Sequence, residues 1–328
     1  MRKIEKLMRE KAAELLADGA VDRVLAWRRG EFFYDNAPAF FADAKECEQI
    51  VYDEFCPANL CKYLLQTSSK GLKAAVFLKP CDTYGVNQLL KDNRIKRELV
   101  HAVGTPCSGM LDIKKIKTAG AKGIIKVEAA GDEVIVTTAL GEIKLPKAEL
   151  LLDKCRMCKG NEYKIADEEL GEKLPTPVFD GDKFAGVKAI EAMPPEEKFA
   201  FWQQELSKCI RCNACRDICP ACTCEQCIFD HPESPVAGKA YADPVEEQFF
   251  HIIRAYHVAG RCVGCGECAR VCPQGVKLGL LNMKFLKDIN TFFGPYQAGA
   301  DAVTPAPQVD YKQNDYEVSI AVAGKGGK

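Results

Sequence analysis

The segments KCIRCNACRDICP (208–220) and RCVGCGECARVCP (261–273) carry the same cysteine spacing, C-x2-C-x2-C-x3-C-P. In such a run the first three cysteines form a tight loop whose thiolates converge on one iron–sulfur cubane, while the fourth ligates the cluster of the other run. The proline then turns the chain away from the site. The doubled spacing predicts a bacterial-type dicluster ferredoxin-like α+β domain over residues 196–290, holding two 4Fe–4S clusters.

Crossed ligation gives each cluster three ligands from one run and a fourth from the other. The first cluster takes Cys209, Cys212, Cys215 and Cys272, and the second takes Cys262, Cys265, Cys268 and Cys219. Thiolates are soft ligands that select iron–sulfur or zinc over hard cations. Zinc is the alternative, but two crossed quartets with trailing prolines differ from zinc-finger spacing. Five basic residues beside the ligands could offset the cluster charge or simply be solvated: Lys208, Arg211, Arg216, Arg261 and Arg270.

The composition is that of a folded protein with an unusual number of cysteines. Of 328 residues, 18 are cysteine, and 11 of these lie between Cys209 and Cys272. Lys and Arg (45) balance Asp and Glu (46), which makes nucleic acid an unexpected partner. Residues 1–22 carry charges throughout, and no apolar run approaches the ~20 residues that cross a bilayer. We therefore expect a cytoplasmic protein without membrane insertion, whose cysteines bind metal rather than form disulfides.

Residues 1–190 predict a mixed α/β domain. Apolar runs at 21–27, 72–80 and 98–106 predict strands. Helical patterns occur at 59–65, before the second of these strands, and at 84–91, between the second and the third. A strand, helix and strand in that order favour a parallel βαβ unit.

Four further segments complete the expected organisation. Residues 123–146 alternate with period two, which predicts hairpins, and 243–260 predicts an amphipathic helix between the two cysteine runs. The stretch 175–195 is rich in Pro, Gly and Asp and predicts a linker. Residues 291–328 predict an extended or partly disordered tail that could lie on a partner.

A third thiolate site is expected in the N-terminal domain. LKPCD places Cys81, and GTPCSG places Cys107, at the C-terminal ends of successive predicted strands, and CRMC supplies Cys155 and Cys158 after another apolar run. The C-terminal ends of parallel strands face one crevice, so these four thiols could converge there. A 4Fe–4S cluster is the favoured occupant, with zinc or unligated thiols as the alternatives.

The remaining cysteines carry weaker signals. CPACTCEQC adds Cys222, Cys224 and Cys227, which could hold another metal if a fourth ligand arrived, but buried small side chains are the favoured interpretation. Cys47, Cys56 and Cys61 have irregular spacing and stay unassigned.

The sequence offers no candidate catalytic residue. The four histidines form no i, i+3 or i, i+4 pair, and each is predicted to pack or to face solvent: His101, His231, His251 and His257. Dinucleotide, Walker A and G-x-S-x-G motifs are absent from the sequence.

Over residues 50–285 these motifs together resemble one known family. The order KPCD, GTPCSG, CRMCKGNEYKIADEELGE, CIRCNACRDICPACTCEQC and HVAGRCVGCGECARVCPQG is similar to the beta subunits of deazaflavin-reducing hydrogenases and formate dehydrogenases. The likeness extends to bacterial relatives that accompany heterodisulfide-reductase-type complexes. CPACTCEQC and AGRCVGCGEC are its most specific parts, because they go beyond generic ferredoxin spacing.

The resemblance implies a subunit that moves electrons between a catalytic partner and another carrier. It also implies an extra cluster in the N-terminal core, at Cys81, Cys107, Cys155 and Cys158. Deazaflavin-reducing members hold FAD there as well, but no segment of this chain matches a flavin-binding segment residue by residue, so FAD binding stays open.

Three functions follow from the sequence. The first is a non-catalytic iron–sulfur subunit of an anaerobe's oxidoreductase complex, which relays single electrons from or to a formate dehydrogenase, hydrogenase or similar subunit. The second is a flavin-containing module that exchanges hydride with a deazaflavin or nicotinamide. The third is a zinc-binding adaptor, against which the doubled spacing already argues.

Overall fold

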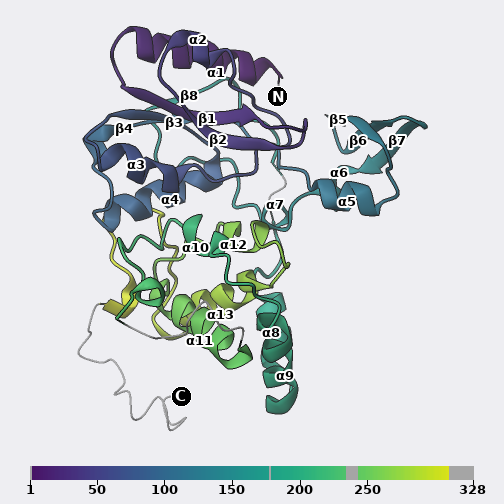
Figure 1. Cartoon of the computed structure of the whole chain (residues 1–328), viewed down its shortest axis with the longest axis vertical. Coiled ribbons are helices and arrows are strands. Elements are labelled where there is room, and N and C mark those ends of the chain that lie inside the picture. The colour runs from purple at the N-terminus through teal and green to yellow at the C-terminus, as the bar shows by residue number, and fades with distance from the viewer. Residues whose placement is uncertain (1, 177–178, 234–242, 310–328) are drawn as a thin grey trace.

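The computed structural model describes residues 2–176, 179–233 and 243–309, and its N-terminal part is built on a five-stranded sheet (Figure 1). The strand order is β2-β1-β3-β4-β8. The strands are β1 (Arg23–Arg29), β2 (Asn36–Phe41), β3 (Ala74–Leu78), β4 (Val100–Gly104) and β8 (Glu168–Glu169). All neighbours are parallel except β2, which pairs antiparallel with β1 at the edge.

The central strands confirm the predicted βαβ unit. Every residue of β3 is buried, as expected of a strand covered on both faces. Helix α4 (Pro80–Lys91) connects β3 to β4, and Pro80 at its start supplies the fixed φ that suits a first helical turn. Figure 1 shows α1 (Arg2–Ala17) and α2 (Ala44–Cys47) over one face of the sheet, and α3 (Leu64–Ser68) with α4 on the other.

A second, antiparallel sheet projects from the side of the molecule (Figure 1). It has the order β5-β6-β7 and forms the hairpins expected at 123–146. Its elements are β5 (Ile124–Ala130), β6 (Glu133–Thr138) and β7 (Gly141–Pro146), flanked by α5 (Ile113–Thr118) and α6 (Lys147–Leu150).

The cysteine-rich part is a set of short helices and loops packed beneath α4. Its helices are α8 (Ala185–Glu191), α9 (Pro195–Leu206), α10 (Ala214–Asp217), α11 (Pro244–His257), α12 (Glu267–Arg270) and α13 (Leu278–Phe292). Short α7 (Asp153–Arg156) lies beside α12. Single 3-10 turns occur at Cys61–Tyr63, Arg97–Leu99, Ile228–Asp230 and Pro307–Val309. The architecture is thus an α/β domain followed by a smaller helical unit with the two cysteine loops, and α11 confirms the helix predicted at 243–260.

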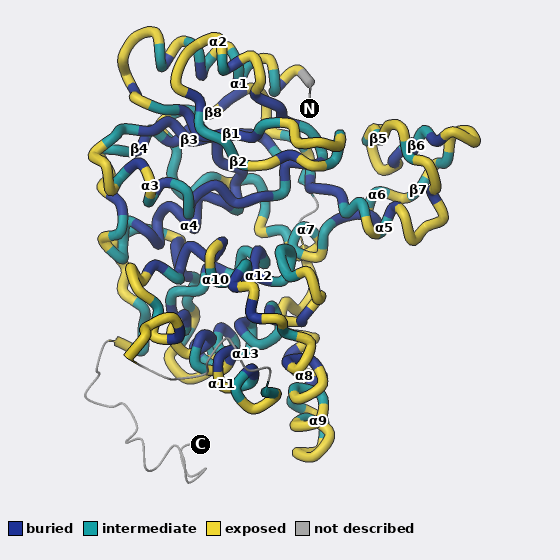
Figure 2. Tube along the Cα trace, in the orientation of Figure 1, coloured by how far each residue is buried: buried dark blue, intermediate teal, exposed yellow. Residues whose placement is uncertain are grey.

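Helix α4 is the buried layer between the two parts (Figure 2). Nine of its twelve residues are buried. At Gly85 a methyl group would lie 2.8 Å from Cys61 Sγ, which is too close, whereas its distance of 3.5 Å from Pro220 Cγ would be an ordinary contact. The glycine therefore permits α4 to lie against the 3-10 turn at Cys61–Tyr63.

Three segments differ from expectation. The helix predicted at 59–65 is a 3-10 turn followed by α3, which begins only at Leu64. The predicted linker 175–195 contains α8, whose Val187 and Ile190 are buried. The described part of the predicted tail packs on the body: Ala298 is fully buried and Gly299 O accepts a hydrogen bond of 3.1 Å from Asn87 Nδ2. The rest, 310–328, lies outside the described residues.

Among the residues that the structure describes, no helix combines the length and the apolar character needed to span a bilayer. The boundary placed near residue 190 stays a prediction.

Candidate metal centres

The two cysteine runs fold into the same local shape. In the first run Arg211 and Asn213 have left-handed backbone conformations, with φ of 52° and 63°. The corresponding positions of the second run are Gly264 and Gly266, with φ of 65° and 70°. Because non-glycine residues reach this region at a cost, its use at Arg211 and Asn213 indicates that the loop shape is required in both runs.

This loop shape turns backbone N–H groups toward sulfur. The Arg211 N–H donates to Cys209 Sγ at 3.3 Å, and the Gly264 N–H makes the equivalent bond to Cys262. On the other side of the second run, Asn282 Nδ2 donates to Cys268 Sγ at 3.3 Å. Hydrogen bonds of this kind hold ligating sulfurs in place and tune an iron–sulfur centre.

One cavity is lined by all four cysteines of the first predicted quartet. Cys209, Cys212 and Cys215 of the first run face it, together with Cys272, the last cysteine of the second run. Cys215, Cys268 and Cys272 also pack in one apolar cluster with Leu206 and Val276. Cys272 of the second run thus lies at the same cavity as three cysteines of the first run, which is the arrangement that the predicted crossed ligation needs.

Cys219, the last cysteine of the first run, lies with the second quartet. It packs against Cys262, and its charge raises the pKa of Cys262, Cys265 and Cys268, after burial as the largest cause. Burial raises the pKa of Cys268 to about 12. A bound metal would be needed to hold such a thiol as thiolate at neutral pH.

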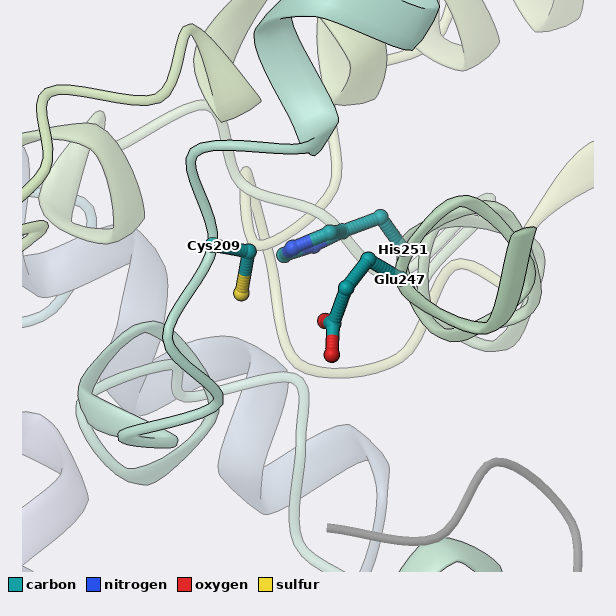
Figure 3. Close-up of side chains that lie close together, drawn as sticks. All are labelled: Cys209, Glu247 and His251. Carbon is teal, nitrogen blue, oxygen red and sulfur yellow. The ribbon is translucent and has the colours of Figure 1, made fainter. Parts of the chain in front are cut away.

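One compact group of metal-ligating side chains lies at the first predicted quartet. Among the described residues, Cys209, Glu247 and His251 have ligand atoms within 4.8 Å of one another (Figure 3).

The four N-terminal cysteines gather at the edge of the parallel sheet. Cys81 lies in the first turn of α4, one step beyond the strand end where it was expected, and Cys107 follows β4. Burial is the largest cause that raises the pKa of Cys81, of Cys107 (to about 12) and of Cys158. Neighbouring thiols raise these pKa values further: Cys107 acts on Cys81, and Cys155 acts on Cys107 and on Cys158. Gly109 N donates to Cys107 Sγ, and Met110 N to Cys155 Sγ, both at 3.4 Å.

Buried charges join this third site to the second quartet. Lys154 Nζ lies 2.5 Å from Glu267 Oε1, and Arg270 Nη2 lies 2.8 Å from Glu267 Oε2. Burial alone would raise the pKa of Glu267, but the Lys154 and Arg270 cations lower it to about 2. Glu267 is the first residue of α12 and lies between the predicted ligands Cys265 and Cys268 in the chain, so the network holds the second run against the N-terminal domain.

Lys159 lies in the same junction. Its ammonium donates to Val263 O and sits 4.4 Å from the centre of the Tyr84 ring. Burial lowers the pKa of Lys159, while the thiols of Cys265, Cys262 and Cys81 raise it. One buried cation is therefore close to cysteines of two sites.

The basic residues noted beside the ligands are paired with carboxylates. Their partners are Glu205 for Lys208, Glu247 for Arg211, Asp217 and Asp230 for Arg216, Asp92 for Arg261 and Glu267 for Arg270. Sequence reasoning missed Arg254, a buried α11 residue whose Nη2 donates to Cys215 O at 2.9 Å. Its position on the inner face of an amphipathic helix was the available signal.

The other cysteines divide into two groups. Cys47, Cys56 and Cys61 are buried in the core, and the Cys61 thiol donates to Asp82 O at 2.8 Å. Cys222, Cys224 and Cys227 line an open groove with Lys62 and Arg216. Cys224 is exposed, which departs from the expected buried side chain.

The fold and the thiol sites define a dicluster iron–sulfur protein, and comparison with known proteins agrees. Residues 205–276 match the family described as 4Fe-4S dicluster domain. The chain is similar to the beta subunits of F420-dependent formate dehydrogenases. It is 26% identical to that subunit of Methanocaldococcus jannaschii, over 89% of this chain and 90% of the relative. It is 26% identical to the subunit of formate dehydrogenase 1 of Methanococcus maripaludis, over 75% and 78%. The resemblance drawn from the motifs is thereby confirmed.

A solved structure with partial likeness is a chain of the F420-reducing NiFe hydrogenase complex from Methanosarcina barkeri. It has a TM-score of 0.41 and 15% identity, and the alignment covers 63% of this chain and 89% of that one.

Proposed function

We propose that this chain is an iron–sulfur electron-transfer subunit that relays single electrons between a catalytic oxidoreductase subunit and another carrier. The observation that carries the proposal is the succession of thiol sites through the molecule. Cys81 of the third site and Cys265 of the second both neighbour Cys61, and Cys219 and Cys268 of the second neighbour Cys215 of the first. Clusters bound at such sites supply one-electron transfer.

The proposed ligands are the three quartets predicted from the sequence. They are Cys209, Cys212, Cys215 and Cys272 for the first cluster, Cys262, Cys265, Cys268 and Cys219 for the second, and Cys81, Cys107, Cys155 and Cys158 for the third. The cavity behind the first quartet, the packing of Cys219 on Cys262 and the mutual effects of the four N-terminal thiols support these sets.

The surrounding side chains keep water away and offset negative charge. Cys215, Cys219 and Cys268 are buried, while Cys212 of the first quartet is exposed. Arg254 and Lys159 lie beside several of these sulfurs. The first cluster would thus be reached from solvent at Cys212, whereas the other proposed ligands lie deeper. This arrangement suits electron exchange with a partner at Cys212 and transfer from there to the second cluster.

The partners follow from the relatives. Because those relatives are subunits of F420-dependent formate dehydrogenases, we propose that this chain works beside a formate dehydrogenase, hydrogenase or similar subunit, or a heterodisulfide-reductase-type module. We propose a cytoplasmic location, because a chain with this many cysteine ligands suits a reducing compartment.

The first test is metal analysis of protein purified without oxygen. Iron, acid-labile sulfide, zinc and flavin are measured per chain. About twelve irons support three cubanes, and about eight leave only the dicluster module. Cys107→Ser is expected to remove about four irons, whereas the matched core variant Cys47→Ser is expected to remove none. Zinc without sulfide would contradict the proposal.

The second candidate function is a flavin-containing module that exchanges hydride with a deazaflavin or nicotinamide. The names of the relatives favour it, because they are F420-dependent. The residues lining the open groove at Cys222 include no aromatic side chain on which an isoalloxazine could stack. One FAD per purified chain, with its absorbance band near the visible bands of the protein, would favour this second function over the first.

A further inference from the structure

His251 is a buried imidazole whose hydrogen-bonding groups find no partner in the described part of the protein. It lies on α11, it is 2% exposed, and neither Nδ1 nor Nε2 has a hydrogen-bond partner among the described residues. Burying an N–H group without a partner costs roughly 1–3 kcal/mol. We therefore expect this imidazole to have a hydrogen-bond partner in the protein that carries its metal clusters.

The direction of the ring identifies that partner. Figure 3 shows His251 and Glu247 projecting from one face of α11 toward Cys209. Their ligand atoms and Cys209 Sγ lie within 4.8 Å of one another. His251 also lines the cavity that the four cysteines of the first quartet face. The imidazole thus looks into the space that the first cluster would fill.

The neighbours leave His251 as the group suited to donate. Glu247 lies 3.6 Å from Arg211 Nη1 and accepts a hydrogen bond from the Cys209 thiol, so its carboxylate acts here as an acceptor and not as a donor. Phe250 packs edge-on against the imidazole at 4.9 Å between ring centres. At the second quartet a side chain already plays the donating role, because Asn282 Nδ2 bonds Cys268 Sγ.

We propose that His251 is a positioning residue that donates an N–H hydrogen bond to a sulfur of the cluster held by Cys209, Cys212, Cys215 and Cys272. This inference rests on the proposed function. The bond strengthens as negative charge on the sulfur grows, so it favours the reduced form and raises the reduction potential of this cluster above that of a variant lacking it.

The test is an EPR-monitored redox titration of holoprotein prepared without oxygen. His251→Leu is expected to make reduction of one cluster about tenfold less favourable, which is about 59 mV for one electron, and to leave the others unchanged. His251→Gln, which keeps an N–H donor, is expected to restore most of the loss. His257→Leu, at the exposed end of the same helix, is the matched control and should not move any potential.

A measurement on the unmutated protein covers the case in which His251→Leu fails to fold. With ¹⁵N-histidine labelling, pulsed EPR of the reduced protein should show a ¹⁵N coupling to one cluster. An absent coupling, or a titration unchanged in His251→Leu, would overturn the inference while iron content stays normal. Low iron and sulfide in the unmutated protein would instead overturn the proposed function.

Discussion

At the level of single residues, the cysteines divide according to the neighbours that the fold gives them. Cys272 and Cys219 each lie beside the cysteines of the opposite run: Cys272 lines the cavity of the first, and Cys219 packs against Cys262 of the second. The cysteine spacing predicts this exchange of partners, and the positions of these two cysteines in the fold agree with it. It is the feature that most directly tests the ligand sets.

Serine substitutions test the crossed ligation. Cys209→Ser and Cys272→Ser are expected to abolish or alter the same EPR signal, because they belong to one site, whereas Cys219→Ser is expected to affect the other. Each should lower the iron content by about four per chain. Cys224→Ser, at an exposed thiol outside the quartets, serves as the control. Cys272→Ser and Cys219→Ser acting on one signal would contradict crossing.

Glu267 is the residue on which the junction between the two parts depends. Glu267→Gln leaves the buried Lys154 and the partly exposed Arg270 without their anion, and removing one partner of a buried pair costs up to about 3–5 kcal/mol. We expect a correspondingly lower urea midpoint under anaerobic conditions. Glu225→Gln, whose carboxylate is 91% exposed, should change the free energy of unfolding by less than about 0.5 kcal/mol. Equal midpoints for the two variants would show that the buried network does not stabilise the junction.

At the level of elements, the segment after α13 fastens the C-terminal part to α4. Gly299 has φ of 74°, and a methyl group there would lie 2.0 Å from Tyr84 O. Ala298 packs beside Tyr84 and Val263 in one apolar cluster. The segment at Ala298 and Gly299, which the sequence predicted to be part of an extended tail, therefore packs against α4 and against Val263, the residue after Cys262.

Gly299→Ala is expected to weaken the packing of this segment on α4 and to lower the free energy of unfolding. A left-handed alanine costs about 1–2 kcal/mol, and the clash with Tyr84 O adds about 1–3 kcal/mol. Gly71→Ala is the matched control, because its φ of 67° carries the first cost while the space around it is open. Thermal unfolding should place Gly299→Ala clearly below Gly71→Ala, and faster hydrogen exchange around Tyr84 should accompany it. Indistinguishable profiles would argue that the segment does not support α4.

At the level of the whole molecule, the two parts are stabilised differently. The N-terminal core is a continuous apolar cluster that includes Trp27, Phe77 and Leu78, all fully buried. The cysteine-rich part has only small apolar clusters, and the proposed ligands Cys215, Cys219 and Cys268 are members of them. Its fold should therefore depend on the bound clusters far more than the sheet does.

Removal of the clusters tests this difference. In protein stripped of iron by a chelator and an oxidant, we expect residues 205–276 to lose protection from hydrogen exchange while β3 and β4 keep theirs. Mass spectrometry of peptides from both parts gives the comparison in one sample, and untreated protein is the reference. Loss of protection in both parts together would show that the sheet also depends on the clusters.

The sequence by itself determined the elements and ligand types that depend on local pattern. The spacing C-x2-C-x2-C-x3-C-P predicted the two quartets, the apolar runs predicted β3 and β4, and the alternation predicted the hairpins, because each pattern lies in residues close in the chain. The parallel sheet edge also brought Cys81 and Cys107 together as expected.

Only the tertiary structure decided which distant groups meet. Nothing local to His251 marks it as facing Cys209, since the contact joins a helix face to a loop 42 positions earlier across a cavity. The same is true of Lys154 with Glu267 and of Gly299 with Tyr84. Such contacts form when helices, strands and loops that are distant in the chain pack together. They depend on burial and charge pairing across the whole molecule, and they cannot be predicted from patterns of neighbouring residues.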